Sequence, residues 1–98
     1  MNMQNIMAQA QRMQRDIQKK QEEINNTEFE SQSGAVKIIL TGKKEIKEII
    51  IDKNIIKDEE DIEALEDMIK IAFNDAINKI NAETKKKMGA YADLNGLI

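Results

Sequence analysis

Residues 58–88 read DEEDIEALEDMIKIAFNDAINKINAETKKKM, and this stretch decides how the rest of the chain can fold. Its apolar residues recur at steps of three and four, the spacing that places side chains on one face of an α-helix. Asp58 stands where an N-cap is expected, and Lys85–Lys87 precede Gly89, so the charges at both ends complement the helix dipole. The pattern predicts one helix over residues 58–88. Its apolar face consists of Ile62, Leu65, Ile69, Ala72, Phe73, Ala76, Ile77, Ile80 and Met88.

The N-terminus carries a second helical pattern, which runs over residues 3–25 and ends at the turn-forming pair Asn25–Asn26. The apolar face of this helix consists of Met3, Ile6, Ala10, Met13, Ile17 and Ile24. A helix of about 31 residues spans about 46 Å, whereas a seven-residue strand covers only about 23 Å. Both helices must therefore overshoot a small sheet, and we expect them to pair beyond it through their apolar faces and to project as an arm.

Three strand-like segments lie between the two helices. Alternation of apolar with more polar residues predicts the firmest strand over residues 35–41. Gly42 begins a hairpin turn into a strand over residues 45–51, and a weaker edge strand is expected over residues 27–33. The expected fold class is α+β, with a helix, a three-stranded antiparallel sheet and a second helix.

The sequence holds more apolar surface than one copy of this chain can easily cover. Residues 1–88 form the one expected domain, and residues 89–98 are expected to be a disordered tail. A domain of this size buries only about 60–65% of its unfolded surface. Residues 49–51 are apolar on both faces of their strand and need cover on both sides. We expect a homodimer joined at the sheet end, with core or interface residues Ile49, Ile50, Ile51, Met68, Ile71 and Phe73.

The composition argues against an enzyme and against a cofactor or a metal. The chain has neither His nor Cys, and it lacks a Gly-rich phosphate loop. Asp52, Asn54 and Glu63 fit three positions of a calcium loop, but Ile56 and Lys57 occupy the positions of a ligand and of the required Gly. No apolar run approaches the roughly 20 residues that cross a bilayer, so we expect a soluble, cytoplasmic protein without a membrane partner. A net charge of −3 excludes a surface that is basic throughout.

Basic residues nevertheless gather on the outer faces of both helices. Arg12, Arg15 and Lys19 fall within about 60° of one another and almost opposite the apolar face of their helix. The last helix adds Lys79, Lys85, Lys86 and Lys87 near its end, whereas residues 57–67 hold seven acids. In an antiparallel pair the lysines lie beside the N-terminal half of the first helix, so we expect the two basic groups to merge at the arm tip.

Structural explanations compete with a binding role for these charges. The basic residues of the first helix can be a solvated face paired to Asp16, Glu22 and Glu23. The three consecutive lysines can merely balance the dipole at a helix end. Both explanations predict ion pairs or isolated solvation rather than a shared surface.

Several segments match one protein family in order and spacing: Met7–Gln14, Ser33–Lys37, Gly42, Ile49–Asp52, Leu65–Ile69, Ala72–Ala76 and Lys87–Met88. Through them, residues 3–88 resemble the YbaB/EbfC family of bacterial nucleoid-associated DNA-binding proteins. The resemblance implies a helix–three-strand–helix subunit and an intertwined, tweezer-like homodimer with projecting helical arms. It also implies binding to duplex DNA in the nucleoid, which can alter DNA conformation, nucleoid organisation and gene expression.

Under this hypothesis the partners are duplex DNA and a second copy, with no small-molecule substrate. The expected DNA-binding residues are Arg12, Arg15, Lys19, Lys79, Lys85, Lys86 and Lys87. Amide side chains can pair with adenine edges, and the candidates for base contacts are Gln4, Gln11, Gln18 and Asn78. Two alternatives stay open: a helical protein-binding module such as a prefoldin-like chaperone, and an RNA-binding or translation-associated factor.

Overall fold

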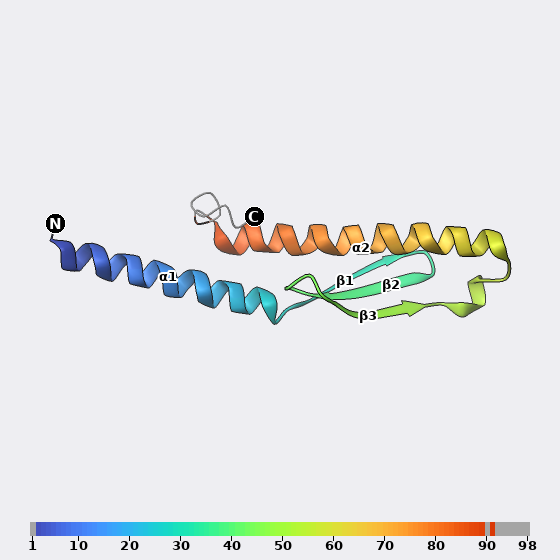
Figure 1. Ribbon diagram of the computed structural model, residues 1–98, viewed down its shortest axis with the longest axis horizontal. Coiled ribbons are helices and arrows are strands. Elements are labelled where there is room, and N and C mark those ends of the chain that lie inside the picture. The colour runs from blue at the N-terminus through green and yellow to red at the C-terminus, as the bar shows by residue number, and fades with distance from the viewer. Residues whose placement is uncertain (1, 90, 92–98) are drawn as a thin grey trace.

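The computed structural model describes residues 2–89 and Tyr91, so most of the expected C-terminal tail lies outside the described residues. The elements follow in the order α1 (Met3–Asn25), β1 (Glu28–Ser33), β2 (Val36–Thr41), β3 (Ile46–Ile51), the short 3-10 helix η1 (Lys53–Ile55) and α2 (Glu59–Met88). The molecule is elongated, with extents of 71 × 20 × 14 Å, and α1 extends well past the C-terminal end of α2 (Figure 1). The α+β class with a helix, a three-stranded antiparallel sheet and a helix is confirmed.

The core lies between α2 and the sheet, whose strands are ordered β1-β2-β3 with antiparallel pairing throughout. Every second residue of β2 is buried, as its alternation requires, and these residues meet small side chains of α2 that let the helix approach closely. The fully buried cluster consists of Val36, Ile38, Leu40, Ala72, Ala76 and Ile80. Phe73 and Met68 pack against this cluster from α2, and Ile51 packs against it from β3.

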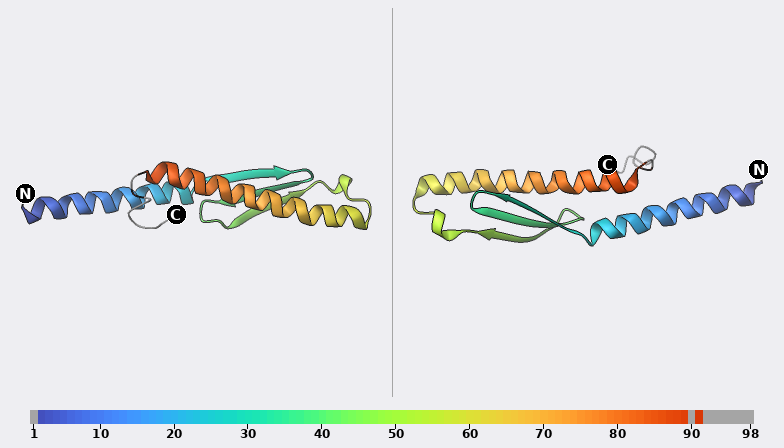
Figure 2. Two further views of the ribbon diagram at one scale, coloured as in Figure 1. Left: turned by 90° about the horizontal axis from the view of Figure 1, so that it is seen from above. Right: turned by 180° about the vertical axis from the view of Figure 1, so that it is seen from behind.

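One helix does not cover three strands. A helix is about 10 Å wide and neighbouring strands are about 4.8 Å apart, so α2 lies over β1 and β2 and leaves β3 at an open edge (Figure 2). Ile49 and Ile50 of β3 remain 42% and 43% exposed, and Ile71 of α2 is also exposed. The uncovered apolar surface that the sequence indicates is therefore present at β3 and on the flank of α2.

The face of the sheet away from α2 is mixed: the register pairs Ile50 of β3 with Lys37 of β2, so Ile50 lies on this face and is 43% exposed, as the expectation of apolar residues on both sides of this strand requires. Lys37 on β2 pairs with Glu30 on β1 at 2.9 Å. Lys47 on β3 reaches across β2 to Glu28 on β1. These cross-strand ion pairs keep part of this face hydrated, and Ile50 leaves apolar surface beside them, so both faces of β3 hold uncovered apolar side chains.

The start of α2 is set by a reciprocal cap. The Asp61 backbone N–H donates to the Asp58 carboxylate, and the Asp61 carboxylate accepts from the Asp58 N–H, both at 3.2 Å. Glu59 and Glu60 add negative charge to the first turn. The acidic opening of this helix is thus explained by capping and by the dipole.

The two helices do not pair along their apolar faces to form the expected arm. Only Ile24 of α1 is buried, and Met3 and Met7 are 74% and 59% exposed. Most of α2 is used in covering the sheet, so only its last turns reach α1, at the C-terminal end of that helix (Figures 1 and 2). Within one copy, the N-terminal half of α1 projects alone.

Candidate nucleic-acid interface

The projecting half of α1 carries an exposed basic line, defined as Arg12, Arg15 and Lys19. Steps of three and four residues place these side chains on the same side of the helix, away from its apolar face. All three are exposed, and none forms an ion pair within residues 2–89 and Tyr91. Their charges are therefore available to an anionic partner.

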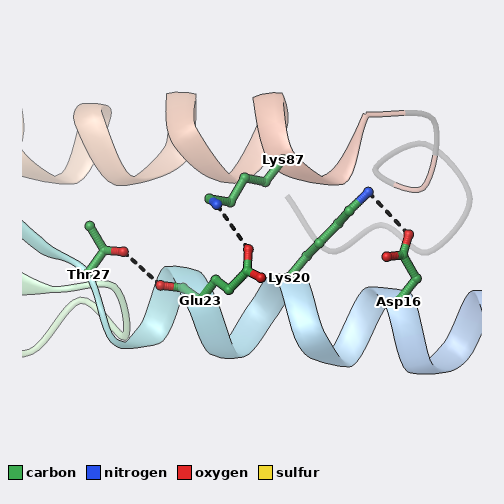
Figure 3. A network of polar contacts seen from close by, with 5 residues as sticks. All are labelled: Asp16, Lys20, Glu23, Thr27 and Lys87. Atoms are coloured by element: carbon green, nitrogen blue, oxygen red, sulfur yellow. Dashed lines mark hydrogen bonds and ion pairs between the residues drawn. The ribbon is translucent and has the colours of Figure 1, made fainter.

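Two of the three carboxylates expected to neutralise this line are engaged elsewhere. Asp16 pairs with Lys20 one turn along α1 at 3.2 Å, and Glu23 pairs with Lys87 of α2 at 3.1 Å (Figure 3). Hydrogen bonding from Lys20 holds the pKa of the Asp16 carboxyl below its ordinary value; Tyr91 and nearby lysine charge act in the same direction, and desolvation opposes them. Among the described residues, Glu22 has no ion pair either. Within the described part of the chain, the basic line is thus solvated but does not form the ion pairs expected with Asp16, Glu22 and Glu23.

The lysine-rich end of α2 lies in a different place from the one expected. The Lys87–Glu23 contact puts it beside the C-terminal end of α1, and not beside the N-terminal half (Figure 3). The reason is that the two helices are offset along their axes. The end of α2 lies beside the C-terminal part of α1, and the two helices overlap only over this short length. Lys85 and Lys86 are exposed in the last turn of α2, and this end of α2 lies well short of the N-terminus of α1, so the two groups do not merge at the arm tip (Figure 1).

Lys79 is separate from both groups. Its ammonium donates a hydrogen bond of 2.6 Å to the Glu30 carbonyl on β1, the first strand of the sheet. Ser31, Gln32 and Lys37 line the same shallow hollow. Lys79 therefore binds a backbone carbonyl at the outer edge of the sheet, well away from the projecting half of α1.

The amides expected to reach base edges are on the surface. Gln4, Gln11 and Gln18 are exposed on α1, and Asn78 is exposed on α2. The structure adds two polar residues that sequence reasoning missed, because Asn5 and Gln9 line a shallow hollow together with Arg12. They precede Arg12 by seven and by three residues, and this spacing, which places side chains on the same helix face, could have predicted them.

Tyr91 is a further residue that sequence reasoning missed. It falls in the segment expected to be a disordered tail, yet its ring centroid lies 5.3 Å from the Lys20 ammonium. Lys20, which interrupts the apolar face of α1, therefore contacts both the Asp16 carboxylate and this ring. No pattern in the sequence points to that contact.

Other kinds of site find no support in the part of the chain that the structure describes. Those residues hold no group of three or more His, Cys, Asp or Glu side chains arranged to bind a metal ion. None of the described helices is both long enough and apolar enough to cross a bilayer.

Fold and surface together define a small α+β protein that presents basic side chains on a projecting helix. The uncharacterized protein HP0035 from Helicobacter pylori has the same fold, with a TM-score of 0.74 and 23% identity over 88% of this chain and 91% of that chain. The model of the YbaB/EbfC DNA-binding family matches residues 1–95, and the chain belongs to that family. A relative from Ruminiclostridium cellulolyticum, named "Nucleoid-associated protein", is 42% identical over 103 residues, covering 99% of this chain and 89% of the relative.

Proposed function

We propose that this chain is a nucleoid-associated protein that binds duplex DNA as a homodimer through the basic line of α1. The observation that carries the proposal is that Arg12, Arg15 and Lys19 are exposed on a projecting helix, while the neighbouring Asp16 and Glu23 pair with Lys20 and Lys87. Membership of a DNA-binding family and the name of the relative support the same function. The protein would then reside with the nucleoid, without catalysis and without a cofactor.

Binding would rest mainly on the phosphates. Each basic side chain that neutralises a phosphate releases condensed counterions, so affinity falls as salt rises. Three neutralised phosphates for each arm of a dimer correspond to a slope of log K against log salt of about −5. The acids of residues 58–67 lie at the opposite end of the molecule and would repel DNA, which leaves the arms as the surface that faces the duplex (Figure 1).

A second copy would complete the apolar surface. Met3, Ile6, Met7 and Met13 form an exposed apolar face on α1, and this face is too large for a helix that stays alone in water. The open α2 side of β3, with Ile46 and Ile49 exposed, is a further region for association. A dimer that covers both regions brings two projecting helices into one assembly, with a basic line on each.

The test is fluorescence anisotropy of a labelled duplex of about 30 base pairs, titrated between about 50 and 200 mM salt. The variant Arg12→Ala/Arg15→Ala/Lys19→Ala should lower affinity and flatten the slope by about 0.9 for each phosphate that is no longer neutralised. Lys53→Ala/Lys57→Ala/Lys70→Ala removes the same charge near the acidic end of the molecule and is the matched control.

Three outcomes would decide the matter. An equal loss of affinity in the two triple variants would show that only net charge acts, and no binding by the wild type at low salt would reject DNA as the partner. Equal or tighter binding of duplex RNA would favour the RNA-binding alternative over the proposal.

A further inference from the structure

The joint between α1 and the sheet is built on backbone contact at Gly42. This residue follows β2 and is buried. A Cβ placed on it would lie 1.8 Å from the Ile24 carbonyl oxygen, 2.4 Å from the carbonyl carbon and 2.9 Å from the Asn25 nitrogen. Unlike Gly34, it does not have a positive φ. Glycine is therefore needed here because the last turn of α1 presses directly on the hairpin, and not because of the turn conformation.

Hydrogen bonds close the joint around Gly42. The Gly42 N–H donates to the Thr27 carbonyl, and the Thr27 N–H donates to the Ile24 carbonyl, both at 3.0 Å. The Thr27 hydroxyl donates to the Glu23 carbonyl at 2.7 Å (Figure 3). The last carbonyls of α1 are thus satisfied by the residue that also holds the hairpin, which fixes the direction in which the helix leaves the sheet.

The rest of α1 has little support of its own within one copy, since Ile24 is its only buried residue. The helix acts as a lever from this joint. Arg12 lies about 18 Å along the axis from Ile24, so a rotation of about 10° at the joint moves the basic line by about 3 Å and the N-terminus by about 5 to 6 Å. Shifts of that size are comparable with the spacing between neighbouring phosphates.

We propose that Gly42 is a positioning residue that sets the angle of the α1 arm and, through that angle, the match of the basic line to the phosphates of a duplex. The part that concerns DNA rests on the proposed function. Gly42 itself touches no ligand. It acts through the Ile24 carbonyl, and any side chain at this position must push the helix away from the hairpin.

The arm angle can be measured without DNA. The chain has no Cys, so the variant Gln4→Cys/Glu66→Cys carries one spin label near the arm tip and one on α2, and dilution with unlabelled protein isolates the distance within one copy. Gly42→Ala should shift or broaden this distance by about 3 to 6 Å. Lys43→Ala is the control, because this exposed residue adjoins Gly42 in the hairpin and does not have a positive φ. An unchanged distance in folded Gly42→Ala would overturn the proposal.

Thr27→Val keeps the proposal testable if Gly42→Ala does not fold. It removes only the hydroxyl that donates to the Glu23 carbonyl. A looser joint should broaden the distance distribution while the helix and sheet content stays the same. An unchanged distribution would count against the joint as the element that sets the angle.

The DNA test compares an intact duplex with one that has a central two-nucleotide gap. Gly42→Ala should bind the intact duplex at least tenfold more weakly and the gapped one less than threefold more weakly, because flexible DNA can follow the displaced arms. The salt slope should stay the same, since the phosphate-binding side chains are all present. An equal loss of affinity on both duplexes would assign the defect to general damage and overturn the positioning role. Failure of the wild type to bind either duplex would reject the proposed function, and the label distance would then decide the role of Gly42 alone.

Discussion

The two helices of this chain are used in opposite ways. Helix α2 buries Ala72, Ala76 and Ile80 against the sheet, so its position is set by apolar packing over most of its length. Helix α1 buries only Ile24, and its position depends on a backbone joint at one end. The packing of α2 stabilises the fold. The attachment of α1 at one end leaves most of its surface exposed.

The polar contacts of the two helices follow the same division. The ion pairs on the sheet join strands within the packed half, as in Lys37 with Glu30. The ion pair of Lys87 with Glu23 and the cation–π contact of Lys20 with Tyr91 hold α1 to the end of α2. These exposed contacts are individually weak and sensitive to salt, so the position of α1 should respond to conditions that leave the core unchanged.

The largest expected effect comes from the packed half. Leu40→Ala removes a fully buried side chain and should lower the free energy of unfolding by about 3 kcal/mol. Gln11→Ala, on the exposed side of the projecting half of α1, should change it by less than about 0.5 kcal/mol. Chemical denaturation followed by circular dichroism measures both. Similar costs for the two variants would contradict the division between a packed half and a free arm.

The next effect concerns association. Ile6→Asp/Met13→Asp puts two charges on the exposed apolar face of α1 and should weaken the dimer at least 100-fold, or about 2.7 kcal/mol. Gln11→Asp/Gln18→Asp adds the same charges on the opposite side of the helix and is the matched control. Sedimentation over a range of concentrations measures both. A dimer that survives the first variant would place the interface away from this face of α1.

Local patterns in the sequence are enough to predict the fold, because helices and strands are marked by spacings of three to four and of two residues. The acids around Asp58 and the small residues Ala72 and Ala76 follow the same rule, since capping and close packing depend on neighbours along the chain. A periodic pattern does not predict how far one element is shifted along another. The position of Lys87 beside Glu23, and not beside the N-terminal half of α1, depends on that offset.

The open face of the sheet shows a second limit. A strict alternation places Lys47 on the same side of β3 as Ile49 and Ile51. The register shifts between Ile39 and Leu40, so Lys47 has no direct partner on β2 and reaches Glu28 on the face away from α2 instead. A β-bulge leaves no clear mark in a single sequence, and the sequence therefore does not predict that Lys47 reaches Glu28 across the sheet.

A smaller effect is expected from the ion pair that joins α1 to α2. Glu23→Gln should release Lys87 from its ion pair and make its charge available to DNA. In a dimer, two additional neutralised phosphates would steepen the salt slope by about 2, and affinity should rise severalfold at low salt. Glu22→Gln changes the charge equally next to a carboxylate without an ion pair among the described residues. Equal effects of the two variants would mean that net charge, and not the release of Lys87, governs binding.

The smallest expected effect is a pH dependence confined to the arm. The pKa of Asp16 is lowered from 3.8, chiefly by hydrogen bonding from Lys20, so the stability that this interaction adds is complete above pH 3.8 and disappears as pH falls through the lowered value. Titration of the Asp16 carboxyl carbon by NMR should give a midpoint below 3.8 in the wild type, and Lys20→Met should move it upward. A wild-type midpoint at or above 3.8 would contradict the interaction. The buried cluster of the packed half contains only apolar side chains, so the tertiary signals of Ile38 and Leu40 should not follow this titration.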